Sequence, residues 1–350
     1  MNELHKISVA MCTYNGSRYL LDQLNSIANQ TLLPHEIVIC DDCSTDNTVD
    51  ILKEFREHTK IDVRIFSNDV NLGSSRNFEK AISLCSGDII ALADQDDIWN
   101  PEKIEKLVDA LSEKNNCALV FSDAEVVDEN IQDLGYRLWE SGNVQFGERL
   151  KSRFIKHGAL DVLIRRYIVT GATMAFRGNL KNLVLPIADS WVHDGWIAFI
   201  LAAIGKEAVF VEEPLIQYRQ HTAQQIGAEK PARERGFILS VYDFIEVRFS
   251  AWKTGQQKPS PVFDCRYLED AKRALLENCT IQEEIQKSGV NLEKIIKLIN
   301  GKIIHQKKRQ EILAKPRIAR IWPVFLELLK GNYHKYSYNV VMQCGKDILN

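Results

Sequence analysis

Short apolar runs alternate with amphipathic segments through the first third of the chain. The runs are rich in β-branched residues and predict strands over residues 7–11, 36–40, 63–66 and 89–93. Apolar residues at helical spacing between them predict helices over about residues 17–29, 75–84 and 101–111, and another that starts near residue 46 and carries Val49, Leu52 and Phe55. This alternation predicts an α/β fold with a Rossmann-like, mainly parallel sheet flanked by helices on both faces.

The pattern is looser after residue 122. We expect strands over residues 118–122, 171–176 and 208–211, a strand or two plus a helix over 123–165, a helix ending near 204, and a loop or edge segment over 214–225. Beyond residue 233 the periodicity is mostly helical, with amphipathic helices over 237–252 and 268–285. Pro316 and Pro323 are expected to interrupt a single long helix. The change in composition predicts two domains, 1–225 and a mostly helical 226–350.

Three carboxylates follow the fourth predicted strand, at Asp94, Asp96 and Asp97. They lie at the carboxyl end of a parallel strand, where open α/β sheets bind ligands. Crowded carboxylates repel one another, so they favour a bound Mg²⁺ or Mn²⁺ whose shell a substrate diphosphate completes. The alternative is an acidic loop capping the helix that starts at Pro101. A cap needs one side chain and Asn100 supplies it, which favours the metal.

Polar clusters also follow the first two strands, and all of them should meet at one edge of the sheet. Thr13, Tyr14 and Asn15 offer backbone amides and an aromatic face that suit a nucleobase. One carboxylate of Asp41 and Asp42 is placed to accept hydrogen bonds from a base imide or ribose hydroxyls. The alternatives are a plain turn and a solvated acidic pair.

A third cluster, with Asn71, Gly73 and Arg76, opens the third helix. A helix start favours anions, and a guanidinium is a planar donor for phosphate. The alternative is an ordinary surface loop.

Asp194 stands at a predicted helix start beside two tryptophans, Trp191 and Trp196. Partial desolvation there would raise its pKa toward the range of a general base. The alternative is an N-cap aspartate. Further along, His221 is a candidate third metal ligand or diphosphate contact, although a lone histidine is more often structural.

Composition narrows the possible partners. The 44 basic and 47 acidic residues give a net charge of −3, so no overall field points to nucleic acid. Most of the eight cysteines fall in predicted strands or helices, which indicates reduced thiols and a cytoplasmic location, and no signal peptide or bilayer-spanning apolar run is expected. Basic and large apolar residues alternate over 307–335. They suit an anionic membrane surface, or alternatively a packing helix.

Taken together, these clusters resemble the family 2 glycosyltransferases, which have the GT-A fold. The matching stretches are residues 9–16, 39–46, 71–77 and 87–97. In residues 93–99, 193–196 and 218–221 the sequence is most similar to that of bacterial rhamnosyltransferase-like members of the family, which build O-antigen, capsule or cell-wall polysaccharide.

The resemblance implies roles for individual residues. Asp194 would be the catalytic base and Asp94 and Asp96 the family's DxD pair, whereas the resemblance leaves the role of His221 open between a metal ligand and a diphosphate contact. The implied nucleotide-sugar site consists of Thr13, Tyr14, Asn15, Asp41, Asp42, Asn71, Gly73, Arg76, Asp94 and Gln95. The implied sugar or acceptor pocket consists of His193, Trp196 and Arg219.

Three departures from the family pattern stand out. Cys43 replaces the usual glycine of the second motif, and His193 replaces the acidic residue that many members carry before the base. The QxxRW pattern of processive synthases is incomplete, which argues against a polymerase.

The implied function is inverting transfer of a sugar from a nucleoside-diphosphate sugar, dTDP-rhamnose or a UDP-hexose, to a glycan or lipid-linked glycan. Residues 1–225 would be the catalytic domain, and residues 226–350 would contact the acceptor or the cytoplasmic face of the inner membrane. One alternative is an Asp-based, metal-dependent phosphohydrolase, which would leave Thr13 and Asp41 without a role. Another is a non-catalytic nucleotide-sugar-binding subunit.

Overall fold

The computed structural model describes residues 5–114, 116–222, 224, 227–231, 265–337 and 340–349. The chain forms two compact units, one of residues 1–228 with 266–299 and one of residues 229–265 with 300–350. The helix expected over 237–252 lies outside the described residues. The division of function between residues 1–225 and 226–350 stays a prediction.

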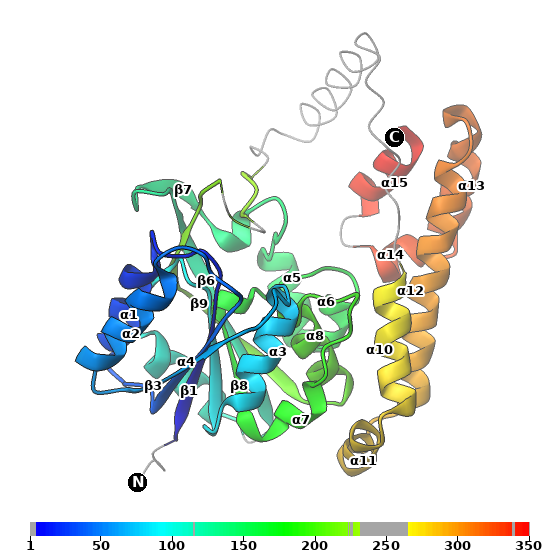
Figure 1. The fold of residues 1–350 in the computed structure, drawn as a ribbon. Helices are drawn as coiled ribbons and strands as arrows, with labels where there is room; N and C mark the ends of the chain where they lie inside the picture. Colours follow the sequence, from blue (N-terminus) through cyan, green and yellow to red (C-terminus); the bar gives the residue numbers. More distant parts are fainter. Residues whose placement is uncertain are drawn as a thin grey trace. The chain divides into compact units, whose positions relative to one another are not determined.

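A nine-stranded mixed sheet is the framework of the first unit, in the order β3-β2-β1-β4-β8-β6-β9-β5, with β7 paired to β6 (Figure 1). Its strands are β1 (Ile7–Thr13), β2 (Glu36–Asp41), β3 (Asp62–Ser67), β4 (Ile89–Ala93), β5 (Ile98–Trp99), β6 (Cys117–Val127), β7 (Asp133–Arg137), β8 (Met174–Arg177) and β9 (Glu207–Arg219). The four strands β1–β4 run parallel, as does β6 with β9, and the other pairs are antiparallel. The predicted α/β class with a mixed sheet is confirmed.

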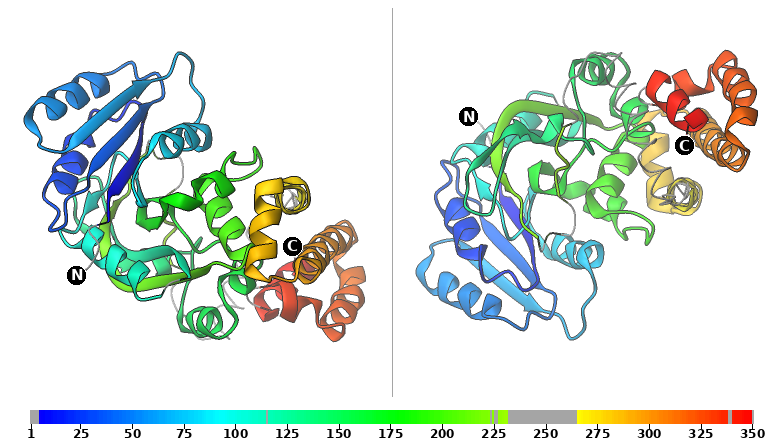
Figure 2. Two further views of the ribbon diagram at one scale, coloured as in Figure 1. Left: turned by 90° about the horizontal axis from the view of Figure 1, so that it is seen from below. Right: turned by 90° about the horizontal axis from the view of Figure 1, so that it is seen from above.

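Helices cover both faces of the parallel strands. Those of the first 228 residues are α1 (Leu20–Ala28), α2 (Thr48–His58), α3 (Ser74–Leu84), α4 (Lys103–Ser112), α5 (Glu148–His157), α6 (Ala159–Leu163), α7 (Lys181–Val184) and α8 (His193–Ala203). Helices α1 and α2 lie on one side of β1–β3, and α3 packs on β1 and β2 from the other side (Figures 1 and 2). Every residue of β2 and β4 is buried, as expected for strands covered on both faces.

The amino-terminal ends of the parallel strands are joined through one carboxylate, that of Glu36. Its Oε1 accepts hydrogen bonds from the hydroxyl of Ser8 (2.6 Å) and from the amide (2.6 Å) and hydroxyl (2.8 Å) of Ser86, and its Oε2 accepts from Arg64 (2.8 Å). Burial raises the pKa of Glu36, but these hydrogen bonds outweigh it and lower the pKa to about 2.

The later part of the sheet differs from the prediction in two places. Residues 171–173 form a short 3₁₀ helix, η2 (Gly171–Thr173), before β8. The segment expected as a loop from residue 214 is strand up to Arg219, because β9 continues past Pro214. The pairing of β6 with β9 shifts register beside Pro214, and a bulge tolerates a residue without an N–H.

The amphipathic segment 268–285 is two helices rather than one, α10 (Arg266–Glu277) and α11 (Cys279–Ser288). Asn278 separates them, because its side chain accepts a hydrogen bond from the Ile281 amide and so caps α11. The Trp191 indole donates to the Tyr267 carbonyl (2.6 Å), and this contact joins α10 to the segment before α8.

In the described residues, the helices of the second unit are the part of α12 (Leu292–Leu313) from residue 300 onward, α13 (Arg317–Leu329), α14 (Asn332–Tyr336) and α15 (Val340–Leu349). Its core contains Ile312, Val324 and Tyr333. Pro316 caps the start of α13 and ends the helical run, as predicted, whereas Pro323 lies inside α13 without ending it. None of the helices in the described residues is long and apolar enough to cross a bilayer.

Candidate active site

The loop after β1 is held against two other site segments. The Thr13 hydroxyl donates to Asp41 (2.8 Å), and the side-chain carbonyl of Asn15 accepts from the Thr45 amide (2.8 Å). Tyr14 is 51% exposed. An aromatic face therefore stands open at the carboxyl end of β1, as the sequence predicts.

Gln95 joins the acidic loop to this aromatic loop. Its amide oxygen accepts from the Tyr14 N–H (2.8 Å), and its amide nitrogen donates to the Tyr14 carbonyl (3.0 Å). A Cβ at Gly16 would lie 2.1 Å from Gln95 Oε1, so a larger residue there would displace the end of the Gln95 side chain. The backbone amide of Tyr14 is thus occupied by Gln95.

Asp41 and Asp42 are both buried and both fully engaged with the protein. Asp41 accepts from Thr13 and from the amide (2.9 Å) and hydroxyl (2.5 Å) of Ser44. Asp42 accepts from the Asn68 side chain (2.7 Å) and from the amides of Leu72 (2.7 Å) and Gly73 (2.9 Å). Asp41 therefore shapes its own turn, and Asp42 fixes the loop that opens α3.

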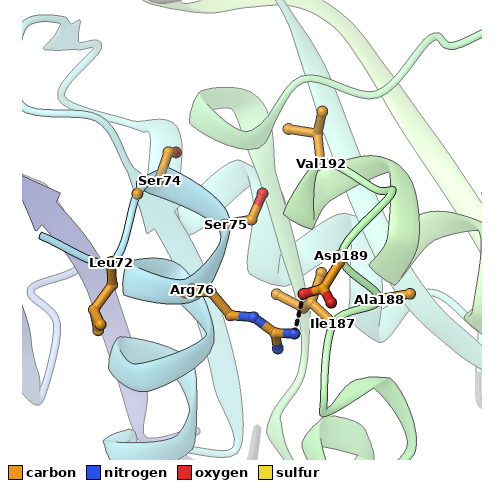
Figure 3. Close-up of a pocket in the computed structure, with 9 residues that line it drawn as sticks. Leu72, Ser74, Ser75, Arg76, Ile187, Ala188, Asp189 and Val192 are labelled. Atoms are coloured by element: carbon orange, nitrogen blue, oxygen red, sulfur yellow. Dashed lines mark hydrogen bonds and ion pairs between the residues drawn. The ribbon is translucent and has the colours of Figure 1, made fainter.

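That loop places Asn71, Gly73 and Arg76 around the start of α3. The Asn71 side chain donates to the Asp42 carbonyl (3.0 Å), and Gly73 has φ 77°, which favours glycine. Arg76 forms ion pairs with Glu79 and with Asp189, whose carboxylate is 89% exposed (Figure 3).

A pocket of about 470 Å³ lies between the start of α3 and the segment before α8. In Figure 3 the Arg76 side chain crosses from α3 toward Asp189, so this ion pair spans the pocket. The lining residues are Leu72, Gly73, Ser74, Ser75, Arg76, Ile187, Ala188, Asp189 and Val192. An anion entering the pocket would meet a guanidinium that is paired with Glu79 and with the exposed carboxylate of Asp189.

The acidic run after β4 is crowded. Burial and the negative charges of Asp96 and Asp194 together raise the pKa of Asp94 to about 7. His221 Nε2 lies 2.8 Å from Asp96 Oδ2, so the segment that follows β9 places this histidine beside the acidic loop. The structure thus brings Asp94, Asp96 and Asp194 together from segments 100 residues apart in sequence.

A divalent cation fits the chemistry of this donor set. Asp94 and Asp96 are partly buried and repel each other, at an energetic cost that a nearby cation would remove, and oxygen ligands suit Mg²⁺ and Mn²⁺. The described residues contain no group of three or more His, Cys, Asp or Glu side chains arranged around a common metal position. A cation held by Asp94 and Asp96 would have to take its remaining ligands from elsewhere, such as a diphosphate.

Arg219 and Asp97 stabilise the acidic loop from within. Arg219 is 2% exposed, and its side chain donates to the Asp96 carbonyl (2.7 Å), the Glu129 carbonyl (3.0 Å) and Asp22 (3.1 Å). Its amide donates to Asp97 Oδ1 (3.1 Å). These contacts make Arg219 a support of the loop, and its predicted place in a sugar pocket remains a prediction.

A buried lysine that the sequence reasoning missed lies beneath the acidic loop. Lys103 is 0% exposed, and its ammonium donates to the Ala172 carbonyl (2.6 Å) and lies 3.6 Å from the centroid of the Trp99 ring. Burial lowers the pKa of Lys103, and the charges of Asp97 and Asp94 oppose that effect. The signal was available in the sequence, because Lys103 shares the helical spacing of Leu107 and Leu111 and so falls on the buried face of α4.

Asp194 stands in the first turn of α8 and is 5% exposed. Its Oδ2 accepts from the Gly171 amide (2.7 Å) and its Oδ1 from the Gly195 amide (2.7 Å). The Tyr167 hydroxyl is also hydrogen-bonded to Asp194, which together with burial raises the pKa of Tyr167. The carboxylate is therefore fixed in orientation, and no sequence pattern had singled out Tyr167.

The neighbours of Asp194 face the protein interior. His193 is 5% exposed and stacks on Phe78 with ring centroids 3.9 Å apart, and neither ring nitrogen has a hydrogen-bond partner. Burial lowers the pKa of His193. Trp196 is 3% exposed and donates to the Val184 carbonyl (2.8 Å). The structure gives both residues packing contacts, and their predicted contact with a sugar or acceptor stays untested.

Comparison with known proteins identifies the family. The family model described as glycosyl transferase family 2 matches residues 8–177. The dTDP-rhamnosyl transferase RfbG of Shigella flexneri is 30% identical over 230 residues, which cover 62% of this chain and 74% of that protein. The putative teichuronic acid biosynthesis glycosyltransferase TuaG of Bacillus subtilis is 32% identical over 162 residues, covering 46% and 62%. The chain belongs to glycosyltransferase family 2.

Other relatives are matched over a similar share. An uncharacterized glycosyltransferase of Haemophilus influenzae is 35% identical over 221 residues, 62% of this chain and 66% of that protein. In fold, the chain is similar to the crystal structure of S. aureus TarS 1–349 in complex with UDP-GlcNAc, with a TM-score of 0.50 and 17% identity, covering 91% of this chain and 79% of that one. The GT-A fold class expected from the sequence is confirmed.

Proposed function

We propose that this protein transfers a sugar from a nucleoside-diphosphate sugar to a hydroxyl of a glycan or lipid-linked glycan, with inversion at the anomeric carbon. The observation that carries the proposal is the meeting of Asp94, Asp96 and Asp194 at one edge of the sheet, with Asp194 held by two backbone amides. One pair of carboxylates suits a metal-bound diphosphate, and the third suits a proton acceptor.

The nucleoside would lie against the loop after β1. The exposed face of Tyr14 is available for stacking on a base, and the segment shaped by Asp41 and Asp42 borders it. Arg76 would exchange its exposed partner Asp189 for a phosphate oxygen of the donor. Gln95 would hold the loop after β1 and the acidic loop in fixed positions relative to each other.

Asp194 would act on the acceptor. As the acceptor oxygen attacks the anomeric carbon, Asp194 takes the proton of that hydroxyl, and the bond from the anomeric carbon to the diphosphate breaks. A cation held by Asp94 and Asp96, with His221 hydrogen-bonded to Asp96, would supply positive charge for the departing diphosphate. Arg76 would add a second positive charge at the same leaving group.

The similar proteins suggest which donor this protein uses and in which pathway it acts. The similarity to RfbG, a dTDP-rhamnosyl transferase, supports dTDP-rhamnose as the donor, and the similarity in fold to TarS in complex with UDP-GlcNAc supports a UDP-hexose. The names of RfbG and TuaG support a place in bacterial surface polysaccharide synthesis. No disulfide links the cysteines of the described residues, which supports a cytoplasmic location.

The test is release of nucleoside diphosphate across a panel of dTDP- and UDP-sugars, with Mg²⁺ or Mn²⁺ and with chelator, in the presence of a bacterial membrane extract as the source of acceptor. We expect one donor to be consumed and chelator to suppress the reaction. If no nucleotide sugar is bound or consumed and a phosphate ester is hydrolysed instead, the phosphohydrolase alternative replaces the proposal. If a donor binds without turnover in every extract, the protein is a non-catalytic binding subunit.

A further inference from the structure

Helix α13 has apolar residues on two faces, and only one of them is covered. Val324 and Leu328 pack in the core of the second unit. The other face presents five large apolar side chains that we call the α13 stripe: Ile318, Ile321, Trp322, Phe325 and Leu329, which are 87%, 54%, 65%, 44% and 67% exposed. Their spacing of 3, 4, 7 and 11 residues from Ile318 places them in one line along the helix.

The continuity of the stripe is what sets it apart. Single exposed apolar residues are normal on protein surfaces, whereas contiguous apolar patches mark contact sites. The rings of Trp322 and Phe325 lie with centroids 5.6 Å apart, so the middle of the stripe is one connected apolar surface. This surface has no covering partner among the described residues, and its composition requires a partner that accepts aliphatic and aromatic groups.

The charge around the stripe indicates what that partner is. Residues 300–350 contain ten Lys and Arg and three Asp and Glu, a net charge of +7, while the whole chain has −3. Two of the three acids are buried, Glu327 at 4% and Asp347 at 1% exposure, and so are three of the ten basic residues, Lys302, Arg309 and Arg320. Lys315 before the helix and Lys330 after it are exposed at its two ends. Like charges would disfavour pairing of this face with a second copy, whereas an anionic surface would attract it.

We propose that α13 lies on the surface of an anionic phospholipid bilayer, with the α13 stripe among the upper acyl chains and Lys315 and Lys330 at the headgroups. A 13-residue helix with a cationic border and Trp, Phe, Leu and Ile on one face has the composition of helices that lie in the membrane interface. The remaining residues 1–299 have a net charge of −10, so attraction to anionic lipid is confined to residues 300–350. The inference goes beyond sugar transfer, because it concerns where the chain is held rather than what it catalyses.

The experiment is flotation of the full-length protein with vesicles of phosphatidylcholine alone and of phosphatidylcholine with phosphatidylglycerol. We expect binding to the anionic vesicles that weakens in about 0.5 M salt, where surface charges are strongly screened. The double substitution Trp322→Ser with Phe325→Ser should weaken binding at least about tenfold, and Lys315→Glu should weaken it by a smaller factor. The matched control is Ile155→Ser on α5, since Ile155 is 75% exposed and lies outside the stripe.

The proposal is overturned if the wild type does not float with anionic vesicles, or if the double variant floats equally well. It is also overturned if the wild type is a dimer that the double variant converts to a monomer without any vesicle binding, because the stripe would then be a contact between copies. Far-UV circular dichroism checks that the variants fold. Hydrolysis of the nucleotide sugar in solution should be unchanged in both variants, so loss of vesicle binding is separable from failure of the proposed sugar transfer.

Discussion

Replacement of Glu36 by Gln tests the account of the sheet on which the site is built. Glu36 is the first residue of β2, whose last residue is Asp41, and its side chain is 3% exposed. Ser8, Arg64 and Ser86 donate to it from β1, from β3 and from the segment before β4. A glutamine side chain at this position would keep the shape and lose the negative charge that these donors stabilise.

The size of the effect follows from the pKa. Folding lowers the pKa of Glu36 from 4.5 to about 2, so the ionised carboxylate stabilises the folded state by about 3 kcal/mol at pH 7. Because the folded pKa is the lower one, this contribution is complete above pH 4.5 and is lost as the pH falls toward 2. At pH 3 we expect roughly 1.4 kcal/mol to remain.

The assay is urea unfolding of wild type and Glu36→Gln at pH 7 and at pH 3, followed by far-UV circular dichroism. The difference in unfolding free energy should be about 3 kcal/mol at pH 7 and about half of that at pH 3. Glu57→Gln on the exposed side of α2 is the control and should change stability by less than about 0.5 kcal/mol. A difference for Glu36→Gln that is small or equal at the two pH values would refute the reasoning.

Two further substitutions test contacts closer to the chemistry. Lys103→Met removes the donor to the Ala172 carbonyl and should lower the unfolding free energy by about 3 kcal/mol. It should also lower kcat more than it raises KM, because η2, which contains Ala172, also holds Asp194. The control Lys106→Met, at the surface of the same helix, should change the unfolding free energy and the kinetic constants by far less. Equal effects of the two lysine substitutions in melting and kinetic assays would contradict this. Gly16→Ala displaces the flexible end of Gln95 and should cost less than about 1 kcal/mol of stability. In calorimetric titration it should weaken the binding of UDP or dTDP at least about threefold. An unchanged Kd would show that the contact of Gln95 with Tyr14 does not shape the nucleotide site.

The parallel part of the sheet was predictable because its strands are buried on both faces and read as continuous apolar runs. The predicted strand over 89–93 has the bounds of β4, and the other three parallel strands differ by one or two residues. The antiparallel part was less predictable. Pro214 lies inside β9 because a bulge absorbs it, and Asn278 breaks an amphipathic run by capping α11. Both depend on local backbone geometry that periodicity does not report.

The site was predictable to the extent that it follows the ends of strands. The loops after β1, β2 and β4 meet as expected, through Thr13 with Asp41 and Tyr14 with Gln95. What the sequence did not show is how many of these polar groups bond to one another. Asp42 fixes a loop 30 residues away, and Tyr167 bonds to Asp194, a pairing that depends on tertiary packing and has no spacing rule.

The central claim is that Asp194 accepts the proton of the acceptor hydroxyl, and kinetic comparison of wild type with Asp194→Asn tests it most directly. The substitution keeps the size of the side chain and removes its basicity. With the donor identified from the panel, we expect kcat to fall by about 10²–10⁴-fold while the Kd of the donor, measured by calorimetric titration, stays within about threefold of wild type. Turnover by Asp194→Asn near the wild-type rate, with the donor still bound, would contradict the account.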